Sequence, residues 1–408
     1  MAAMRSILAG SVACVAAITI ASCGGGGSGD SMAPFGGASG YVATSLVSNL
    51  NTPGNPYTGS NVDPLLVNAW GIAFNPQGFV WVANNGSSTS TLYDGNGVAQ
   101  TLVVAIPPGT AGPASPTGIV FNGTQAFQVT QAGSTGASAF IFVGEAGTVS
   151  AWSPAVNMTN AIKVVDGEAQ SKVYKGLAIA TQAGAPQLYA ADFHNGVVDV
   201  FDANFAPVVR AGAFIDNTLP AGYAPFGIQA IGNQIFVAYA MQDASAHDEV
   251  AGAGVGAVDV FDTAGNLVKR LISPGGKLNA PWGMTMAPAN FGPFSNALLV
   301  GNFGDGKINA FDPVTGASLG TLTNPAGAAI AIDGLWGIAF GNGINAQPTS
   351  TLFYGSYLID SPGCCPKSGT GKCTFTVTSS TNADPAPGGR EPIGKPYGRS
   401  PMFESFCV

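Results

Sequence analysis

Trp336-Gly337-Ile338-Ala339-Phe340 repeats, letter for letter, the earlier segment Trp70-Gly71-Ile72-Ala73-Phe74. Phe226-Gly227-Ile228 and Trp282-Gly283-Met284 have the same form, an aromatic residue followed by Gly and an apolar residue. The spacing of roughly 50 residues between successive copies is typical of repeats that each form one small structural unit. Six copies can be traced, and their first glycines are Gly71, Gly118, Gly176, Gly227, Gly283 and Gly337.

Each copy continues with further short apolar strands separated by turn residues. Leu188–Asp192 and Val197–Asp202 are two such strands, and Thr263-Ala264-Gly265-Asn266 is one such turn. About four short strands cannot bury both faces of their own sheet, whereas sheets packed around an axis can. No amphipathic helix of useful length is indicated, which argues against an α/β domain. The repeats therefore predict an all-β fold, a six-bladed β-propeller.

The composition of the chain agrees with this fold, and the segment before the first repeat indicates how the ring closes. The chain has 58 Gly and 28 Pro among 408 residues and is 46% hydrophobic, which suits many short strands joined by tight turns. The propeller is expected over residues 41–359, where Tyr41–Val47 has no unit of its own and should close the last blade as its outer strand.

Residues 360–408 form a Cys-, Pro- and Gly-rich tail that we expect to be irregular. Only Lys372–Thr378 within it has the pattern of a strand. The tail is either an ordinary C-terminal extension or a frameshifted terminus. In an oxidising compartment its cysteines would tend to form disulfides, with the pairing left open; they are Cys364, Cys365, Cys373 and Cys407.

The N-terminus has the pattern of a targeting segment. Arg5 precedes a short apolar stretch that ends in Ile20-Ala21-Ser22-Cys23, which resembles a bacterial lipobox. We expect a signal peptide over 1–22, lipidation of Cys23 and a Gly-rich tether over 23–40. The alternative is an ordinary signal peptide with a chance cysteine. Because no Asp follows Cys23, the lipobox reading favours the outer over the inner membrane, and hence a lipid-anchored protein of the cell envelope.

The units resemble NHL-type propeller repeats, and residues 41–354 resemble a family of exported bacterial propeller proteins of unknown function. The segments that carry this resemblance are Val67–Ala73, Tyr239–Asp243, His247–Gly254 and Leu299–Gly306. The resemblance implies the fold and export but no activity. After Tyr354 the chain departs from the pattern of that family, which puts closure of the last blade in doubt.

Candidate metal ligands follow from the topology of a propeller. Loops between second and third strands share one face, which usually holds the ligand site. His194 lies in one such loop, and His247 lies with Asp243 and Asp248 in the long insert over 241–256. Imidazole with carboxylate suits Zn²⁺, and carboxylates with amides suit Ca²⁺. These four residues are our candidate divalent-metal site; alternatively, both histidines are solvated loop residues.

Candidate ligand-binding residues occupy the position before each repeat glycine, at the mouth of the predicted central channel. They either form an aromatic collar with one cation, able to stack on a ligand, or wedge between blades as packing. The collar would comprise Trp70, Lys175, Phe226, Trp282 and Trp336.

The net charge of the chain narrows the classes of partner that it can bind. The net charge is −8, with only 14 Lys and Arg, which argues against a nucleic-acid partner. The preferred hypothesis is a non-catalytic, monomeric propeller that binds a small molecule, a glycan or a cell-envelope protein and meets the membrane only through its lipid. The second hypothesis is a metal-dependent hydrolase or lactonase on the same face. No catalytic residue can be assigned.

Overall fold

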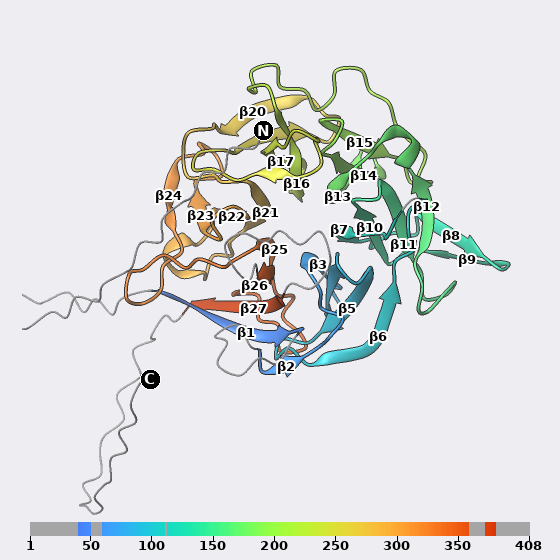
Figure 1. Ribbon diagram of the computed structural model, residues 1–408, viewed down its shortest axis with the longest axis horizontal. Helices are drawn as coiled ribbons and strands as arrows, with labels where there is room; N and C mark the ends of the chain where they lie inside the picture. The colour runs from blue at the N-terminus through green and yellow to red at the C-terminus, as the bar shows by residue number, and fades with distance from the viewer. Residues whose placement is uncertain (1–39, 50–58, 111, 359–371, 381–408) are drawn as a thin grey trace, which may run out of the picture. The chain divides into compact units, whose positions relative to one another are not determined.

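In a computed structural model the chain folds into small sheets arranged in a ring (Figure 1). The structure describes residues 40–49, 59–110, 112–358 and 372–380. Within these ranges the only helices are the short 3-10 turns η1 (Glu168–Gln170) and η2 (Gly292–Phe294), so the all-β propeller prediction is confirmed. None of the described helices has the length and apolar character needed to cross a membrane. Cys23, with the predicted signal peptide and the predicted tether up to residue 39, lies outside the described residues.

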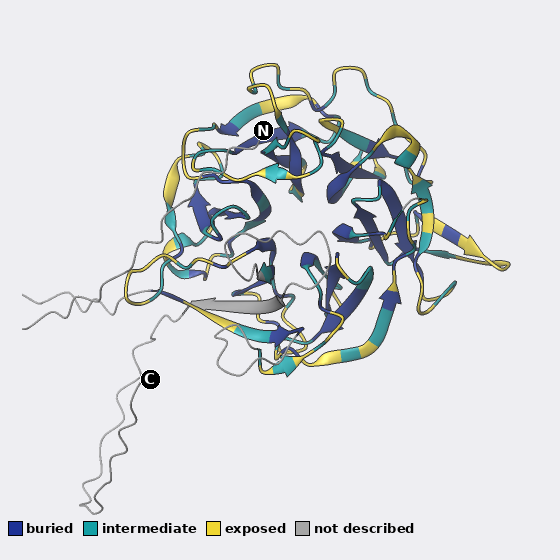
Figure 2. Cartoon of the chain, viewed as in Figure 1, coloured by how far each residue is buried: buried dark blue, intermediate teal, exposed yellow. Residues whose placement is uncertain are grey.

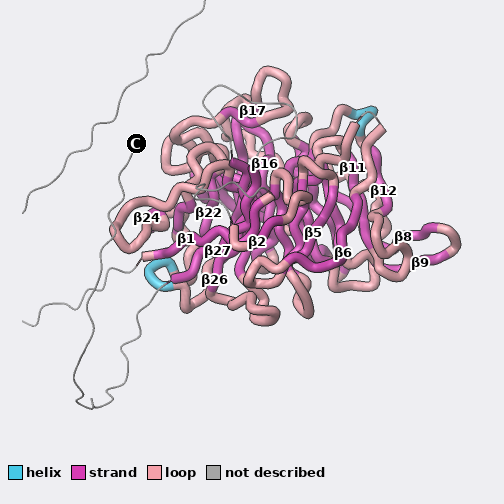
Figure 3. The backbone as a smooth tube through the Cα atoms, turned by 60° about the horizontal axis from the view of Figure 1, so that its bottom comes forward, coloured by secondary structure: helices cyan, strands magenta, loops and turns pink. Residues whose placement is uncertain are grey.

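Five of the described sheets have four or five strands, one has three, and a separate hairpin has two. The hairpin extends outward from the ring (Figure 3). The strands, sheet by sheet along the chain, are β3 (Ala69–Phe74), β4 (Val80–Asn84), β5 (Thr89–Tyr93) and β6 (Ala99–Ala105); β7 (Pro116–Phe121), β10 (Phe140–Gly144), β11 (Thr148–Trp152) and β12 (Ile162–Asp166), with the hairpin β8 (Gln128–Gln131) and β9 (Ser134–Ala137); β13 (Tyr174–Gln182), β14 (Ala185–Asp192) and β15 (Val197–Phe201); β16 (Tyr223–Ile231), β17 (Gln234–Gln242), β18 (Glu249–Val250), β19 (Ala257–Asp262) and β20 (Leu267–Ile272); β21 (Pro281–Met286), β22 (Leu298–Asn302), β23 (Ile308–Phe311) and β24 (Ser318–Thr321); and β25 (Leu335–Phe340), β26 (Thr351–Leu358), β27 (Lys372–Ser380), β1 (Tyr41–Ser48) and β2 (Asn61–Val62).

The core lies between neighbouring sheets. The second strands β4, β10 and β22 are buried at every position, because adjacent sheets cover both of their faces. The outer strand β6 instead includes exposed positions at the rim of the ring (Figure 2). Trp81 of β4 stacks on Phe140 of β10 with ring centroids 4.0 Å apart, which joins two consecutive sheets. This two-sided burial explains why the second strands are continuously apolar.

The repeat glycines allow the inner strands to approach one another. A Cβ on Gly71 would lie 2.3 Å from the carbonyl oxygen of Thr117, and a Cβ on Gly227 would lie 2.0 Å from that of Trp282. Each of these oxygens belongs to the inner strand of the next sheet. A side chain at either position would therefore push neighbouring inner strands apart.

The last sheet closes the ring with strands from both ends of the chain. β1 lies in this sheet as predicted and pairs antiparallel with β27. β27, which contains the predicted strand Lys372–Thr378, pairs on its other edge with β26. The sheet therefore extends beyond residue 359, where the sequence placed the end of the propeller, because its third strand comes from the predicted tail.

One unit does not form the predicted four-stranded blade. The β13–β15 sheet has three strands, so five complete blades are present where the repeats predicted six. After β15 the chain turns back and forms a single bridge between Phe201 and Pro207. Pro207 has no N–H to donate to a ladder, and beyond the hydrogen bond from Val208 N to the Val200 oxygen (2.8 Å) the chain leaves the sheet.

Candidate functional site

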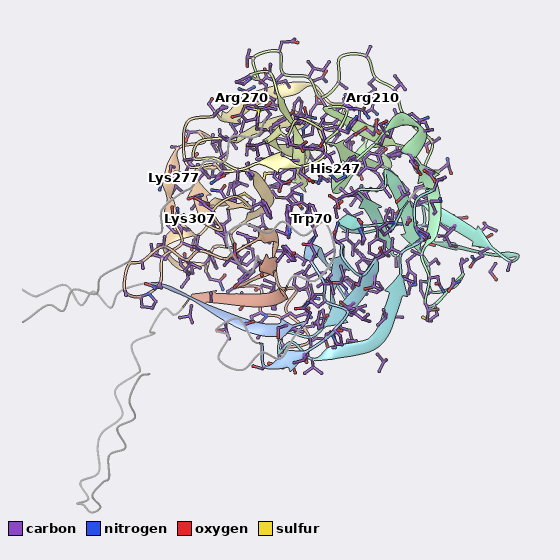
Figure 4. The ribbon with its side chains drawn as sticks, viewed as in Figure 1. Trp70, Arg210, His247, Arg270, Lys277 and Lys307 are labelled. Atoms are coloured by element: carbon purple, nitrogen blue, oxygen red, sulfur yellow. The ribbon has the colours of Figure 1, made fainter. Side chains whose placement is uncertain are left out.

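An open cavity of about 1080 Å³ lies where the second strands end and the inner strands begin. This is the face of the ring that the sequence predicted to carry a ligand site. Figure 4 shows Trp70 and His247 toward the middle of the ring, whereas Arg270 and Lys307 lie farther out. Side chains lining the cavity include Trp70, Glu145, Lys175, His194, His247 and Trp336.

The predicted aromatic residues pack on one another at the floor of the cavity. Trp70 stacks on Trp336 with ring centroids 3.7 Å apart, and Phe303 stacks on the other side of Trp336 at 4.1 Å. Trp70 and Trp336 are each only 3% exposed, so they form a packed plug rather than an open collar. Trp282 is half-buried and lines a smaller space of about 40 Å³ among the inner strands. Phe226 is fully buried in the same cluster.

Lys175 of β13 is buried beside this plug. Its Nζ donates to Glu145 Oε1 at 2.5 Å and to Asp248 Oδ1 at 3.4 Å, and it lies 5.2 Å from the centroid of the Trp70 ring. Burial alone would lower the pKa of Lys175, but the nearby carboxylates of Glu145 and Glu249 outweigh it and raise that pKa. Lys175 is therefore a permanent ammonium, stabilised by carboxylates and an aromatic face.

A chain of hydrogen bonds connects Lys175 to the tryptophan plug. Asn85 Nδ2 donates to Glu145 Oε2 at 2.9 Å, and Asn68 Nδ2 donates to Asn85 Oδ1 at 3.0 Å. Trp336 Nε1 in turn donates to Asn68 Oδ1 at 3.1 Å. Both oxygens of Glu145 are thus engaged, which fixes the direction of its carboxylate.

The insert between β17 and β19 brings more charge to the cavity. Asp243 Oδ1 accepts the backbone N–H groups of Ser245 and His247, at 3.1 and 2.9 Å, so this carboxylate holds the turn of the insert. His247 Nδ1 lies 2.8 Å from Asp248 Oδ1. That contact holds the pKa of Asp248 at about 2 and raises the pKa of His247.

Glu249, the next residue, has the opposite environment. Burial raises the pKa of its carboxyl to about 7, although the ammonium of Lys175 opposes that shift. Two adjacent carboxyl groups on one cavity wall therefore ionise in very different pH ranges.

The structure brings only two of the four predicted metal ligands together, and it adds a third residue to them. His247 and Asp248 lie together with Glu145, and one ligand atom from each of the three falls within 4.8 Å of the others. His194 and Asp243 line the same cavity but are not members of this cluster. Glu145 and Glu249 were absent from the predicted set. The position of Glu145 directly after the second strand β10 does place it in a second-to-third loop, on the face predicted to carry the ligand site.

Comparison with solved structures aligns the chain with several other proteins. Virginiamycin B lyase from Staphylococcus aureus aligns with a TM-score of 0.44 and 11% identity, over 83% of this chain and 99% of the lyase. The PQQ-bound aldose sugar dehydrogenase of Streptomyces coelicolor aligns with a TM-score of 0.46 and 12% identity, over 83% of this chain and 98% of the dehydrogenase. The propeller assignment itself rests on the strand pairing described above.

Sequence comparison finds relatives in a virus. No protein-family model matches the chain, so the resemblance to NHL repeats and to exported bacterial propellers stays a prediction. "Uncharacterized protein R648" of Acanthamoeba polyphaga mimivirus is 36% identical over 291 residues, which cover 69% of this chain and 70% of R648. "Uncharacterized protein L690" of the same virus is 34% identical over 305 residues, which cover 72% of this chain and 77% of L690. The chain therefore belongs to the protein family that contains R648 and L690.

Proposed function

We propose that the protein is a non-catalytic propeller that binds a small ligand in the open cavity described above, which we call the axial cavity. The observation that carries this proposal is the cavity of about 1080 Å³, on whose floor the buried Lys175 is paired with Glu145. Cavities that bury most of a small ligand have volumes of roughly 300–1,000 Å³ and combine apolar walls with a few fixed polar groups. The proposal counts the β13–β15 sheet as the sixth blade of an NHL-like propeller.

A pair of glycine variants tests the proposal. Gly112 lines the cavity, and a Cβ there would meet nothing within 4 Å, so Gly112→Trp should fill the cavity without a backbone clash. Gly276 has equally open surroundings but is not among the residues lining this cavity, so Gly276→Trp is the matched control. We expect compounds from a fragment set of neutral, cationic and anionic members to raise the Tm of wild type and Gly276→Trp, and not of Gly112→Trp. Equal responses from all three proteins would contradict binding in the cavity.

A second candidate function is metal-dependent hydrolysis on the same face. It is favoured by the cluster of Glu145, His247 and Asp248, since three protein ligands with an open position are typical of catalytic zinc sites. Titration calorimetry with Zn²⁺ and with Ca²⁺ tests it. One bound ion lost in His247→Ala and kept in His194→Ala would support the site. No binding to wild type, or equal loss in both variants, would exclude it.

We also propose that the chain is exported and lipid-anchored at Cys23, with a glycan or a cell-envelope protein as further possible ligands. The support is the segment Ile20-Ala21-Ser22-Cys23 followed by a Gly-rich run. In a bacterial host, Cys23→Ser should abolish incorporation of labelled fatty acid and release the protein from the membrane fraction. Unchanged labelling and partitioning would contradict the anchor.

A further inference from the structure

We propose that the axial cavity selects small ligands that carry an ammonium group, held by Asp248 and Glu249 beside the buried Lys175. The inference rests on the proposed function, because it names the charge of the ligand that this cavity takes.

The charges that line the cavity do not balance. Two lysines, Lys172 and Lys175, face a larger set of acidic side chains. Lys172 is already paired with Asp192 and Asp199, and Lys175 is 1% exposed, so neither ammonium is available to a ligand. A ligand therefore meets a wall of carboxylates, and a concave wall of one sign attracts the opposite charge. The acidic members of the lining are Glu145, Glu168, Asp243, Asp248 and Glu249.

Lys175 shows how this wall stabilises an ammonium. Its Nζ contacts two carboxylates, those of Glu145 and Asp248, and lies near the Trp70 ring. The side chain of Asp248 remains 59% exposed, so its open side can accept a second ammonium from the cavity. No described lysine, arginine or histidine forms an ion pair with Glu249 within 4 Å, so this carboxyl can join Asp248 in binding it.

Trp70 gives an independent indication of a ligand. The Nε1 donor of this side chain has no hydrogen-bond partner among the described residues, although Trp70 is 97% buried and lines the cavity. Figure 4 shows Trp70 at the middle of the ring. A buried donor without an acceptor costs free energy. Trp70 Nε1 is itself covered by neighbouring side chains, so a ligand oxygen that displaces them would recover that cost. The favoured ligand is therefore an amine with a hydroxyl, phenol or carbonyl oxygen at its other end.

The same geometry disfavours a doubly charged ion. A divalent cation among Glu145, His247 and Asp248 would lie next to the ammonium of Lys175, which already donates to two of these three groups. Like charges at contact distance repel strongly in a partly desolvated site. An ammonium ligand carries half the charge of a divalent ion, so Lys175 repels it less, and it can bind on the open side of Asp248 and on Glu249.

Three compounds that share a phenol ring test the charge of the ligand. Tyramine carries an ammonium, 4-hydroxyphenylethanol is neutral, and 4-hydroxyphenylacetate carries a carboxylate. Calorimetry on the full chain at pH 8 should give an affinity for tyramine about tenfold above that for either of the others. Phenylethylamine lacks the phenol oxygen that would accept the hydrogen bond from Trp70 Nε1, so it should bind more weakly than tyramine.

Variants locate the binding groups. Glu249→Gln should lower the affinity for tyramine about fivefold or more and leave that for 4-hydroxyphenylethanol unchanged. Asp312→Asn removes the same charge from a turn between β23 and β24, outside the cavity lining, and keeps an acceptor for that turn. This control should change neither affinity by more than about twofold.

Three other results of these affinity measurements would overturn the inference. Equal affinities, or a preference for the carboxylate, would show that the cavity binds ligands but does not select ammonium. Unchanged tyramine binding in the double variant Asp248→Asn/Glu249→Gln would remove the proposed contacts. If none of the three compounds binds, the ammonium proposal fails, and the Gly112→Trp comparison decides separately whether the cavity binds anything.

Discussion

Lys175 joins three parts of the ring at the floor of the cavity. It belongs to β13, its carboxylate partners come from the β10–β11 loop and from the insert, and the Trp70 ring beneath it belongs to β3. Breaking a buried ion pair by removing one partner leaves an uncompensated charge. The arrangement thus couples the position of the insert to the packing of the ring.

Glu249 is a residue whose ionisation should lower the stability of the fold near neutral pH. Its pKa in the folded protein is about 7, raised by burial from 4.5, so the folded state holds its proton more tightly than the unfolded state does. Stability is then lost as the pH rises from 4.5 through 7, because ionisation favours the unfolded chain. Glu249→Gln should therefore be more stable than wild type by roughly 2 kcal/mol at pH 8, with no difference near pH 4. Urea unfolding at both pH values measures this, and a constant difference would contradict it.

The composition of the cavity wall could be predicted only in part. Two positions in the repeat identified cavity residues. The second-to-third loop contains His247 and Asp248, and the position before the repeat glycine contains Trp70, Lys175 and Trp336. The contact of Lys175 with Glu145 spans two sheets, so it depends on the radius of the ring, which no local pattern encodes. Phe226 has the same repeat position as Trp70 but is not among the residues that line the cavity.

At the scale of elements, the inner strands depend on glycine at one repeat position. Because a Cβ on Gly227 would lie 2.0 Å from the Trp282 carbonyl oxygen, Gly227→Ala should cost about 1–3 kcal/mol. A Cβ on Gly276 would meet nothing within 4 Å, so Gly276→Ala is the matched control and should change stability little. Equal effects of the two changes on thermal unfolding would show that the inner strands are not closely packed.

The strand β27 makes a second prediction at this scale. It pairs along one edge with β26 and along the other with β1, so its loss would separate the two ends of the ring. A chain truncated after Leu358 should have a Tm at least about 10 °C below that of a chain truncated after Ser380. Similar Tm values for the two truncations would mean that β27 does not hold the last sheet together.

The repeats predicted the regular strands of the ring, but not the two places where the ring departs from the repeat. The recurring aromatic–Gly segments indicated each inner strand, and the absence of a unit for Tyr41–Val47 indicated a closing strand. The repeats did not indicate that Pro207 would end the β13–β15 sheet early. Nor did they show that a strand beyond residue 359 would lie between β26 and β1, since that pairing is set by the closure of the ring.

At the scale of the whole molecule, the ring of sheets holds loops from different units around one cavity. The wall residues come from several units, and the strands packed between neighbouring sheets fix the spacing of those units. This arrangement explains how a chain with few charged residues gathers Glu145, Lys175, Asp248 and Glu249 at one place. The account's central claim is that this cavity is the binding site of the protein.

A crystal structure with the tightest binder from the fragment set tests that claim most directly. We predict ligand density in the axial cavity, in contact with Asp248 or Glu249 and above the stacked rings of Trp70 and Trp336, with Lys175 still paired to Glu145. Density for the ligand at any other place on the ring, with the cavity filled by its own side chains, would contradict the account.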